Sequence, residues 1–273
     1  MKKILVPTDF SEASEKTMDY AIELAKCINA ELILLHVFHI PVQPTEAPIM
    51  FFSIDDLEKD NMNALSAFEK KFKNKYGSIK TGLLVKPGFV VDEILSVVQQ
   101  KKVDLILMGV TGAGKSANVL LGSNTTFLMK KTKIPVLVIP QNAQFKEIKN
   151  IALAYDYKNV IDDAVMKKFI EFVTLFKSKV FVLDVLKPKT VPVYQEAISG
   201  LTMENYLKNI DHGLFFPESE NIIDEMNIFV DTHQIDWLVM LPQSHQLLTG
   251  LFHRSNTKRM AFHTHIPLLS LHQ

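Results

Sequence analysis

The residues best suited to chemistry lie in a glycine-bearing loop near the middle of the chain. Gly109 opens this loop and Gly122 closes it, with Gly112, Lys115 and Ser116 between them. Glycine lets backbone N–H groups turn toward an anion, and a helix that begins at the end of such a loop adds a partial positive charge. The loop therefore predicts a phosphate-binding site.

Two phosphate-binding patterns share these letters. The P-loop pattern G-x-x-x-x-G-K-[ST] is satisfied from Gly109 to Ser116, and a second pattern, G-x2-G-x9-G-S, runs from Gly109 to Ser123. A P-loop needs a long helix that starts at its Lys-Ser pair, and Gly122 would end such a helix after about one or two turns. A P-loop also normally follows the first strand of its domain, whereas the strand before this loop is the fourth. We therefore favour the second pattern.

A buried strand is predicted before the loop and a helix after it. Residues 103–108 form a short apolar run of the kind found in parallel sheets, and residues 127–129 continue a helix that ends at Lys130 and Lys131. Similar apolar runs occur at residues 3–6, 31–37, 79–85 and 134–139, with helical patterns between them. This alternation of strands and helices predicts an open, mostly parallel α/β sheet.

The second half of the chain repeats the plan of the first. Ile235 follows Val103 by 132 residues, and the same offset aligns Ser255 with Ser123. Asp156 follows Asp9 by 147 residues, so the second copy lacks about 15 residues (147 minus 132) between its second and third strands. Residues 141–146 are the predicted linker. The sequence is thus a tandem duplication with one shortened copy.

The second copy has lost the glycines of the loop. Leu241, Ser244 and Arg254 stand where the first copy has Gly109, Gly112 and Gly122. If these positions need a positive φ angle or a close backbone approach, the second copy cannot bind phosphate in the same way. The aspartate after the first strand is kept in both copies. We expect a ligand-competent first unit and a degenerate second unit.

The chain resembles the universal stress protein family along both halves. The residues that carry the resemblance are the I-L-V-P-T-D-F-S run at 4–11, the His36-Val37 end of the second strand, the G-x2-G-x9-G-S pattern, and I-P-V-L-V at 134–138. The resemblance implies two tandem Rossmann-like domains (universal stress protein, adenine nucleotide alpha hydrolase-like), 1–141 with the intact nucleotide motif and 147–273 degenerate. Each would be an open five-stranded, mostly parallel sheet of strand order 3-2-1-4-5 with helices on both faces. Ligands of such sheets bind in the crevice where the strand order reverses.

The resemblance also implies a stress-response regulatory protein that binds ATP, or AMP or ADP, in its first domain. Mg²⁺ would be held mainly by the phosphates. The matching positions are Pro7, Thr8, Asp9 and Val37 for adenine and ribose, Met108, Gly109 and Gly112 for the glycine loop, and Gly122, Ser123, Asn124 and Thr125 for the phosphates. Asn124 departs from the family pattern, in which a small apolar residue follows Gly-Ser. Lys115 is either a further phosphate contact or a solvated lysine.

Two alternatives remain open beside this prediction. The first is a scaffold of the same fold that binds partners and no nucleotide, and the second is a P-loop phosphotransferase. Phosphoryl transfer needs a positioned metal and a group that orients the nucleophile, and the sequence pattern supplies neither. We predict no catalytic residue and, at most, slow ATP hydrolysis.

Composition limits the partners. The chain has 273 residues with 30 basic and 30 acidic side chains, so neither nucleic acid nor a membrane surface is predicted as a partner. No apolar run approaches the length of a membrane span, and the N-terminus lacks the pattern of a signal peptide, which predicts a cytoplasmic protein. We expect the last strands of the two units, 134–139 and 266–271, to pair in an intramolecular pseudo-dimer. A homodimer of the whole chain is a further possibility.

Several single residues have two interpretations each. Cys27 is expected to be a buried structural thiol, and Trp237 a core residue of a strand. A long amphipathic helix is predicted from Ile54 to near Tyr76, and Phe51 and Phe52 are expected to pack on it rather than to cover the ligand. The histidines at 245, 253, 263 and 265 are expected to be surface residues rather than metal ligands.

Overall fold

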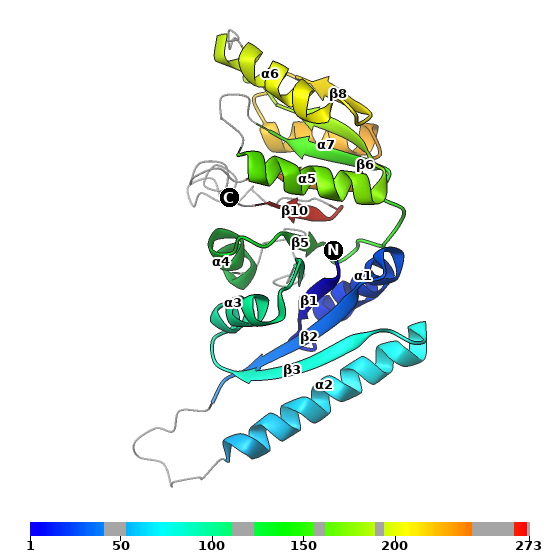
Figure 1. Cartoon of the computed structure of the whole chain (residues 1–273), viewed down its shortest axis with the longest axis vertical. Helices are drawn as coiled ribbons and strands as arrows, with labels where there is room; N and C mark the ends of the chain where they lie inside the picture. Colours follow the sequence, from blue (N-terminus) through cyan, green and yellow to red (C-terminus); the bar gives the residue numbers. More distant parts are fainter. Residues whose placement is uncertain (41–52, 111–122, 156–161, 189–193, 242–264, 272–273) are drawn as a thin grey trace. The chain divides into compact units, whose positions relative to one another are not determined.

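The computed structural model describes residues 1–40, 53–110, 123–155, 162–188, 194–241 and 265–271 (Figure 1). The chain forms two compact units. The first contains Met1–Gly109 together with the helix that follows the glycine loop, and the second contains the chain from Pro135 onward. Each unit is described by itself below.

The first unit is a parallel sheet with helices on both faces. Its strands lie in the order β3-β2-β1-β4, and its elements are β1 (Lys3–Pro7), α1 (Glu12–Ile28), β2 (Glu31–Phe38), α2 (Ile54–Tyr76), β3 (Thr81–Pro87), α3 (Val90–Lys101), β4 (Leu105–Gly109) and α4 (Ser123–Lys131). Ion pairs join α1 to α2, and another joins α3 to α4. Right-handed crossovers accordingly put α1 and α2 on one face and α3 and α4 on the other (Figure 1).

Local sequence explains the ends of α1. The Ser11 side chain caps the helix by accepting a hydrogen bond from the Ser14 N–H at 3.3 Å. At the other end Asn29 adopts a left-handed conformation with φ of 53°, and its N–H bonds to carbonyl groups of the last turn. Between these caps, Met18, Ala21 and Ile22 are fully buried against the sheet.

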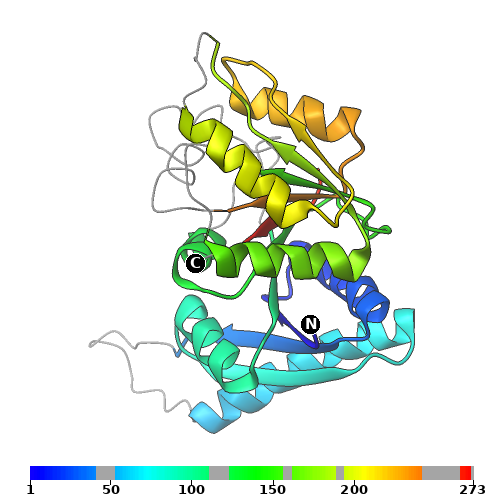
Figure 2. The same ribbon diagram turned by 45° about the horizontal axis from the view of Figure 1, so that its top comes forward.

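The second unit repeats this plan with a shorter chain. Its elements are β5 (Val136–Ile139), β6 (Asn150–Ala154), α5 (Asp163–Phe176), β7 (Lys179–Leu183), α6 (Tyr194–Leu207), β8 (His212–Phe215), α7 (Ile222–Thr232), β9 (Trp237–Met240) and β10 (Leu268–Ser270). The order β8-β7-β6-β9-β10 is the 3-2-1-4-5 order of the family fold (Figure 2). A hydrogen bond from the Tyr206 hydroxyl to Asp163 joins α6 to α5.

The starting residues of equivalent elements confirm the duplication. The offset is 132 for α3 and α7 (222 minus 90), for β4 and β9 (237 minus 105), and for β5 and β10 (268 minus 136). For β1 and β6 it is 147 (150 minus 3). Most of the missing residues come from one helix, because α2 has 23 residues and α6 has 14.

In each unit, an aspartate joins two neighbouring strands at their amino-terminal ends. In the first unit Asp104, which precedes β4, accepts hydrogen bonds from the N–H groups of Lys2 at 2.6 Å and Lys3 at 2.9 Å. These two N–H groups lie at the start of β1. The carboxylate therefore ties β1 to β4 at the edge opposite to the one where the glycine loop begins.

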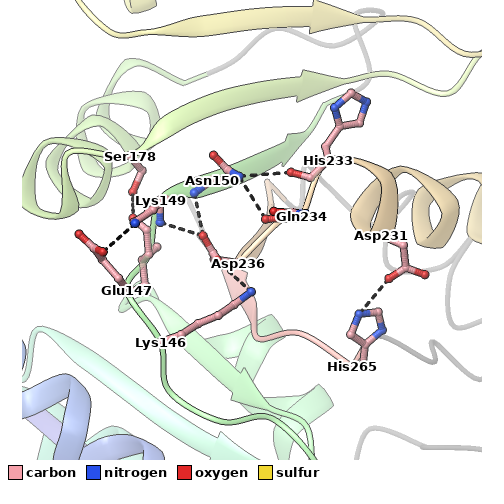
Figure 3. Close-up of polar contacts among 11 residues, drawn as sticks. Lys146, Glu147, Lys149, Asn150, Ser178, Asp231, His233, Gln234, Asp236 and His265 are labelled. Carbon is pink, nitrogen blue, oxygen red and sulfur yellow. Dashed lines mark hydrogen bonds and ion pairs between the residues drawn. The ribbon is translucent and has the colours of Figure 1, made fainter.

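Asp236 has the same role in the second unit (Figure 3). Its Oδ2 atom accepts from the N–H groups of Lys149 and Asn150, both at 2.8 Å. Its Oδ1 atom pairs with the ammonium group of Lys146 at 2.7 Å, and the Asp236 side chain is only 7% exposed. A buried carboxylate is stable only when it is paired and hydrogen-bonded, and both conditions are met here.

The strands β5 and β10 pair antiparallel, with Leu268 opposite Val138. These are the two strands that the sequence predicts as the last of each copy. A pseudo-dimer of two complete domains built on this pairing stays a prediction. So do the boundaries 1–141 and 147–273, since compactness alone groups β5 with the second unit.

One expectation about single residues is wrong and another is right. Cys27 was expected to be buried, but its side chain is exposed. The last buried residue of α1 is Ala25, and Cys27 lies beyond it near the end of the helix. Trp237 is a core residue as predicted, with none of its surface exposed.

The remaining expectations concern metal and membrane sites. His265 is an exposed residue that pairs with Asp231 at 3.0 Å (Figure 3), whereas the other three C-terminal histidines, Phe51 and Phe52 lie outside the described residues. Among the described residues, no group of three or more histidine, cysteine, aspartate or glutamate side chains could hold a metal ion. In that same part of the chain, no helix is long and apolar enough to cross a membrane.

Candidate functional site

The ends of β1 and β4 bring two groups of predicted site residues together. The strands are adjacent and parallel, with Ile4 opposite Leu105 and Leu5 opposite Ile106. Continuing this register places Thr8 beside Gly109. The chain leaves β1 toward one face of the sheet, where it forms α1, while β4 leads toward α4 on the other. This is the point at which the strand order reverses, where open α/β sheets form a ligand crevice.

Asp9 presents a carboxylate at this crevice. Its Oδ1 atom accepts three hydrogen bonds, from the Ser11 N–H at 3.0 Å, the Ser11 hydroxyl at 2.5 Å and the Ser14 hydroxyl at 2.6 Å. Partial burial acts to raise the pKa of Asp9, but the hydrogen bonds from Ser11 and Ser14 outweigh it and hold the pKa below its ordinary value. The carboxylate is therefore ionised at neutral pH. No described hydrogen bond of the structure uses Oδ2, so that oxygen can accept from a ligand.

A turn at Phe10 fixes the direction of Asp9. Phe10 has φ of 63°, a left-handed conformation that is unfavourable for a bulky side chain. Its N–H donates to the Thr8 hydroxyl at 3.1 Å, and its ring stacks on the His36 ring with 4.4 Å between centroids. Strain of this kind persists where surrounding contacts determine it and is frequent at functional sites.

Gly109 is required by packing against α1. A Cβ atom at this position would lie 2.4 Å from the Thr17 hydroxyl oxygen and 3.1 Å from the Ala13 carbonyl oxygen. Its φ is not in the left-handed region, so of the two reasons given for a glycine, close approach applies and positive φ does not. The atoms approached belong to α1. The replacement of Gly109 by Leu241 in the second copy therefore does not by itself prove that a phosphate site was lost.

His36 contacts the backbone of Thr8 at the site, although it was absent from the predicted binding residues. It lies in β2, one residue before Val37, and its Nδ1 atom contacts the Thr8 carbonyl oxygen at 2.8 Å. Its Nε2 atom contacts the Asn61 side-chain oxygen at 3.0 Å. The His36-Val37 pair was part of the family pattern, but nothing in the sequence pairs His36 with a residue of α2.

The predicted phosphate residues form the first turn of α4. Ser123 and Asn124 are exposed there, while Thr125 is buried. The first N–H groups of a helix have no partner inside the helix and lie at its positive end, which suits an anion. Gly112, Gly122 and Lys115 lie outside the described residues. Within the described part of the chain, no hydrogen bond or ion pair joins this turn to Asp9 or Gly109.

The second unit carries larger side chains at the equivalent pair of positions. Ala154 lies opposite Met240, so the next pair along β6 and β9 is Tyr155 and Leu241. This is the pair equivalent to Thr8 and Gly109. Tyr155 is 6% exposed and Leu241 is 3% exposed. A threonine that is itself only 7% exposed and a glycine have been replaced by two larger buried residues.

This arrangement can bind a molecule that has hydrogen-bond donors at one end and negative charge at the other. The Asp9 carboxylate only accepts hydrogen bonds, so it selects amino or hydroxyl groups. The first turn of α4 offers N–H groups and selects an anion. Both features come from segments that follow adjacent strands of one sheet.

Comparison with known proteins gives consistent similarities. The model of the universal stress protein family matches residues 1–140. Universal stress protein MJ0531 of Methanocaldococcus jannaschii is 34% identical over 140 residues, which are 50% of this chain and 81% of that protein. Universal stress protein Slr1230 of Synechocystis sp. is 25% identical over 300 aligned positions, covering 99% of both chains. The crystal structure of a universal stress protein from Archaeoglobus fulgidus has the same fold, with a TM-score of 0.73, 16% identity, and coverage of 99% of this chain and 98% of that chain.

Proposed function

Because the chain belongs to the universal stress protein family, we propose that it is a stress-response regulatory protein whose first unit binds ATP or another adenine nucleotide. The second unit is degenerate, and it serves pairing through its sheet or contacts with partner proteins. Mg²⁺ enters with the nucleotide and is held mainly by the phosphates. The protein acts from the cytoplasm by switching between nucleotide-bound and nucleotide-free states.

Each part of the nucleotide has a matching group in the first unit. Asp9 accepts hydrogen bonds from the adenine amino group or a ribose hydroxyl, while the backbone near Thr8 and the side chain of Val37 border the base. Ser123 and the N–H groups of the first α4 turn bind the phosphates, with Met108 and Gly109 leading into the loop. A carboxylate would repel phosphate, which favours this orientation over the reverse one.

The observation that carries the proposal is the pair of residues at the switch point in each copy. Thr8 and Gly109 are small residues at the switch point of the first unit, and the ionised Asp9 follows Thr8 directly. The second copy has buried Tyr155 and Leu241 at these positions. One fold thus offers an internal comparison between small residues at the switch point of one copy and large residues at the same point of the other.

Binding is tested with the full chain. Mass spectrometry of the purified protein first identifies any nucleotide carried through purification, and calorimetry then measures affinity for ATP, AMP and GTP. We expect ATP or AMP to bind better than GTP, because guanine presents a carbonyl oxygen where adenine presents its amino group. Failure of every adenine nucleotide to bind would contradict the proposal.

Two variants and a control locate the site. Asp9→Asn should weaken ATP binding about tenfold, since it replaces a charged acceptor that is worth about 1.5 kcal/mol. Thr8→Tyr copies the second unit and should abolish binding by filling the crevice. Asp92→Asn removes the same charge from an exposed α3 residue and should leave affinity unchanged. Equal effects of Asp9→Asn and Asp92→Asn would mean that only net charge matters.

The two alternatives predict different results. A scaffold of the same fold binds no nucleotide, and its ATP titration is flat. A P-loop phosphotransferase needs Lys115, so Lys115→Ala would abolish turnover, whereas on our proposal it weakens binding modestly. β4 is the fourth strand of its unit, whereas a P-loop normally follows the first strand of its domain. The strand order along the chain therefore supports our proposal over a P-loop enzyme.

A further inference from the structure

The amino-terminal part of α2 buries no side chain of its own. The buried residues of this helix are Leu65, Phe68 and Phe72, all in its later part. That later part is also joined to α1, through an ion pair from Lys75 to Asp19 at 2.9 Å and by other contacts. By contrast, every described side chain of residues 54–62 is exposed or half-exposed. Packing therefore does not explain why the helix extends so far.

In the described residues of the second copy, the equivalent helix α6 begins later. Four residues separate α2 from β3 (77–80), and four separate α6 from β8 (208–211), so the two helices align at their carboxyl ends. The 14 residues of α6 then correspond to residues 63–76 of α2. Residues 54–62 are the nine without a counterpart (23 minus 14).

One residue of this extra segment reaches the candidate site. The Asn61 amide nitrogen donates to the Leu57 carbonyl oxygen at 2.8 Å, which turns its side-chain oxygen toward Nε2 of His36 at 3.0 Å. Nδ1 of His36 faces the Thr8 carbonyl oxygen at 2.8 Å. The Thr8 carbonyl oxygen can only accept, so Nδ1–H of His36 donates to it, while Nε2 faces the Asn61 side chain. A continuous chain of contacts thus runs from α2 to the end of β1.

The second copy has lost the histidine as well. Strands β2 and β7 begin 148 residues apart (179 minus 31), so Asp184 is the residue equivalent to His36. A carboxylate cannot donate a hydrogen bond to the carbonyl of residue 155, as His36 does to Thr8. The histidine and the small residues at the switch point are therefore present together in the first copy and absent together from the second, whose described residues also show no helix extension.

We propose that residues 54–62 of α2 are a positioning element of the nucleotide site, acting through Asn61 and His36 on the turn from Thr8 to Phe10. This inference rests on the proposed function of the first unit. The chain of contacts holds the Thr8 carbonyl, and the stacking of Phe10 on the same His36 ring holds the left-handed turn that orients Asp9. A displacement of α2 changes the orientation of Asp9 and hence the affinity for the nucleotide.

The test uses three variants of the full chain. Asn61→Leu removes the acceptor with little change in size, Asn61→Asp keeps an acceptor oxygen while losing the amide donor, and Asn63→Leu is a control at an exposed position of the same helix. Calorimetry gives the ATP affinity of each variant. Amide hydrogen exchange of residues 8–14, measured without nucleotide, reports on the turn itself.

We expect Asn61→Leu to weaken ATP binding about tenfold and to speed exchange of the turn by a similar factor. Asn61→Asp should remain within about threefold of the unaltered chain in both measurements. Asn63→Leu should change neither. A merely structural role of Asn61 predicts instead that both Asn61 variants behave alike, because both lose the bond to Leu57.

The outcomes separate this inference from the proposed function. Failure of the unaltered chain to bind ATP overturns the proposed function. Unchanged affinity and unchanged exchange in Asn61→Leu, with ATP bound normally by the unaltered chain, overturn this inference alone. Similar losses in Asn61→Leu and Asn61→Asp overturn it too.

Discussion

Replacing Gly109 by alanine should destabilise the first unit through a contact with α1. The added Cβ atom would lie 2.4 Å from the Thr17 hydroxyl oxygen, which is 1.0 Å closer than the 3.4 Å at which ordinary contact begins. Thr17 cannot move aside easily, because its side chain is buried and its hydroxyl donates to the Ala13 carbonyl at 2.8 Å. Either α1 shifts from β4 or the Thr17 side chain leaves its rotamer.

The size of the effect follows from overpacking. Extra atoms in a packed interior cost about 1–3 kcal/mol, and a contact this short with a buried, hydrogen-bonded side chain belongs near the upper end of that range. Thr17→Ala alone should cost about 1 kcal/mol through its lost hydrogen bond. In the double variant, Thr17→Ala removes the shorter contact but leaves the one with Ala13 at 3.1 Å. The double variant should therefore recover about 1–2 kcal/mol relative to the sum of the single losses.

Urea denaturation of the four proteins, followed by circular dichroism, measures this coupling. ATP titrations of the same set show whether affinity follows stability. If Gly109 acts through α1, Thr17→Ala should restore part of the affinity lost in Gly109→Ala. Strictly additive losses, or a Gly109→Ala variant as stable as the unaltered chain, would refute the packing explanation.

Three further predictions concern single residues. The pKa of Asp9 is lowered on folding, so its ionised form stabilises the protein at pH values above the unfolded-state pKa. This contribution is lost as the pH falls through the folded-state pKa. In thermal scans, the difference in melting temperature between the unaltered chain and Asp9→Asn should therefore narrow only in that acidic range. Asp236→Ala should lower the free energy of unfolding, measured by urea titration, by about 2–4 kcal/mol because it leaves two N–H groups and a lysine unpaired. Glu147→Ala, which removes an exposed ion pair, should lower it by less than about 1 kcal/mol. Trp237 is the single tryptophan and is fully buried, so its emission should be blue-shifted until the second unit unfolds, and Trp237→Ala should cost about 3–5 kcal/mol by denaturation.

The sequence predicts the elements of the fold well because their signals are local. The strand expected at residues 103–108 is observed as Leu105–Gly109, and the long helix expected from Ile54 to near Tyr76 has those bounds. The constant offset of 132 also follows from sequence, since an exact repeat needs no knowledge of contacts. Strand order was available only through the family resemblance, because apolar runs carry no information about which strands are neighbours.

The site was harder to predict because its contacts join distant segments. His36 and Asn61 are 25 residues apart, and their meeting depends on how α2 lies against β2. The packing role of Gly109 likewise depends on Thr17, which is far away in the sequence and close in the fold. Cys27 shows the opposite error, since an apolar helical pattern suggested burial at a position beyond the last buried residue of the helix.

The two copies have diverged at the carboxyl ends of their strands and not at the amino-terminal ends. At the amino-terminal edge Asp104 and Asp236 make the same pair of backbone hydrogen bonds, so this device has been kept in both units. At the carboxyl edge the second copy carries large buried residues and a shorter helix. A requirement for folding acts on both units and preserves the first edge, whereas a requirement for ligand binding acts only on a unit that binds. The divergence is therefore expected where the ligand would be, and a unit that binds no ligand can gain stability from larger buried side chains there. Reversing that change, by Tyr155→Thr with Leu241→Gly, should destabilise the second unit by several kcal/mol through the lost burial, without conferring ATP binding, because the helix extension and the histidine are still missing.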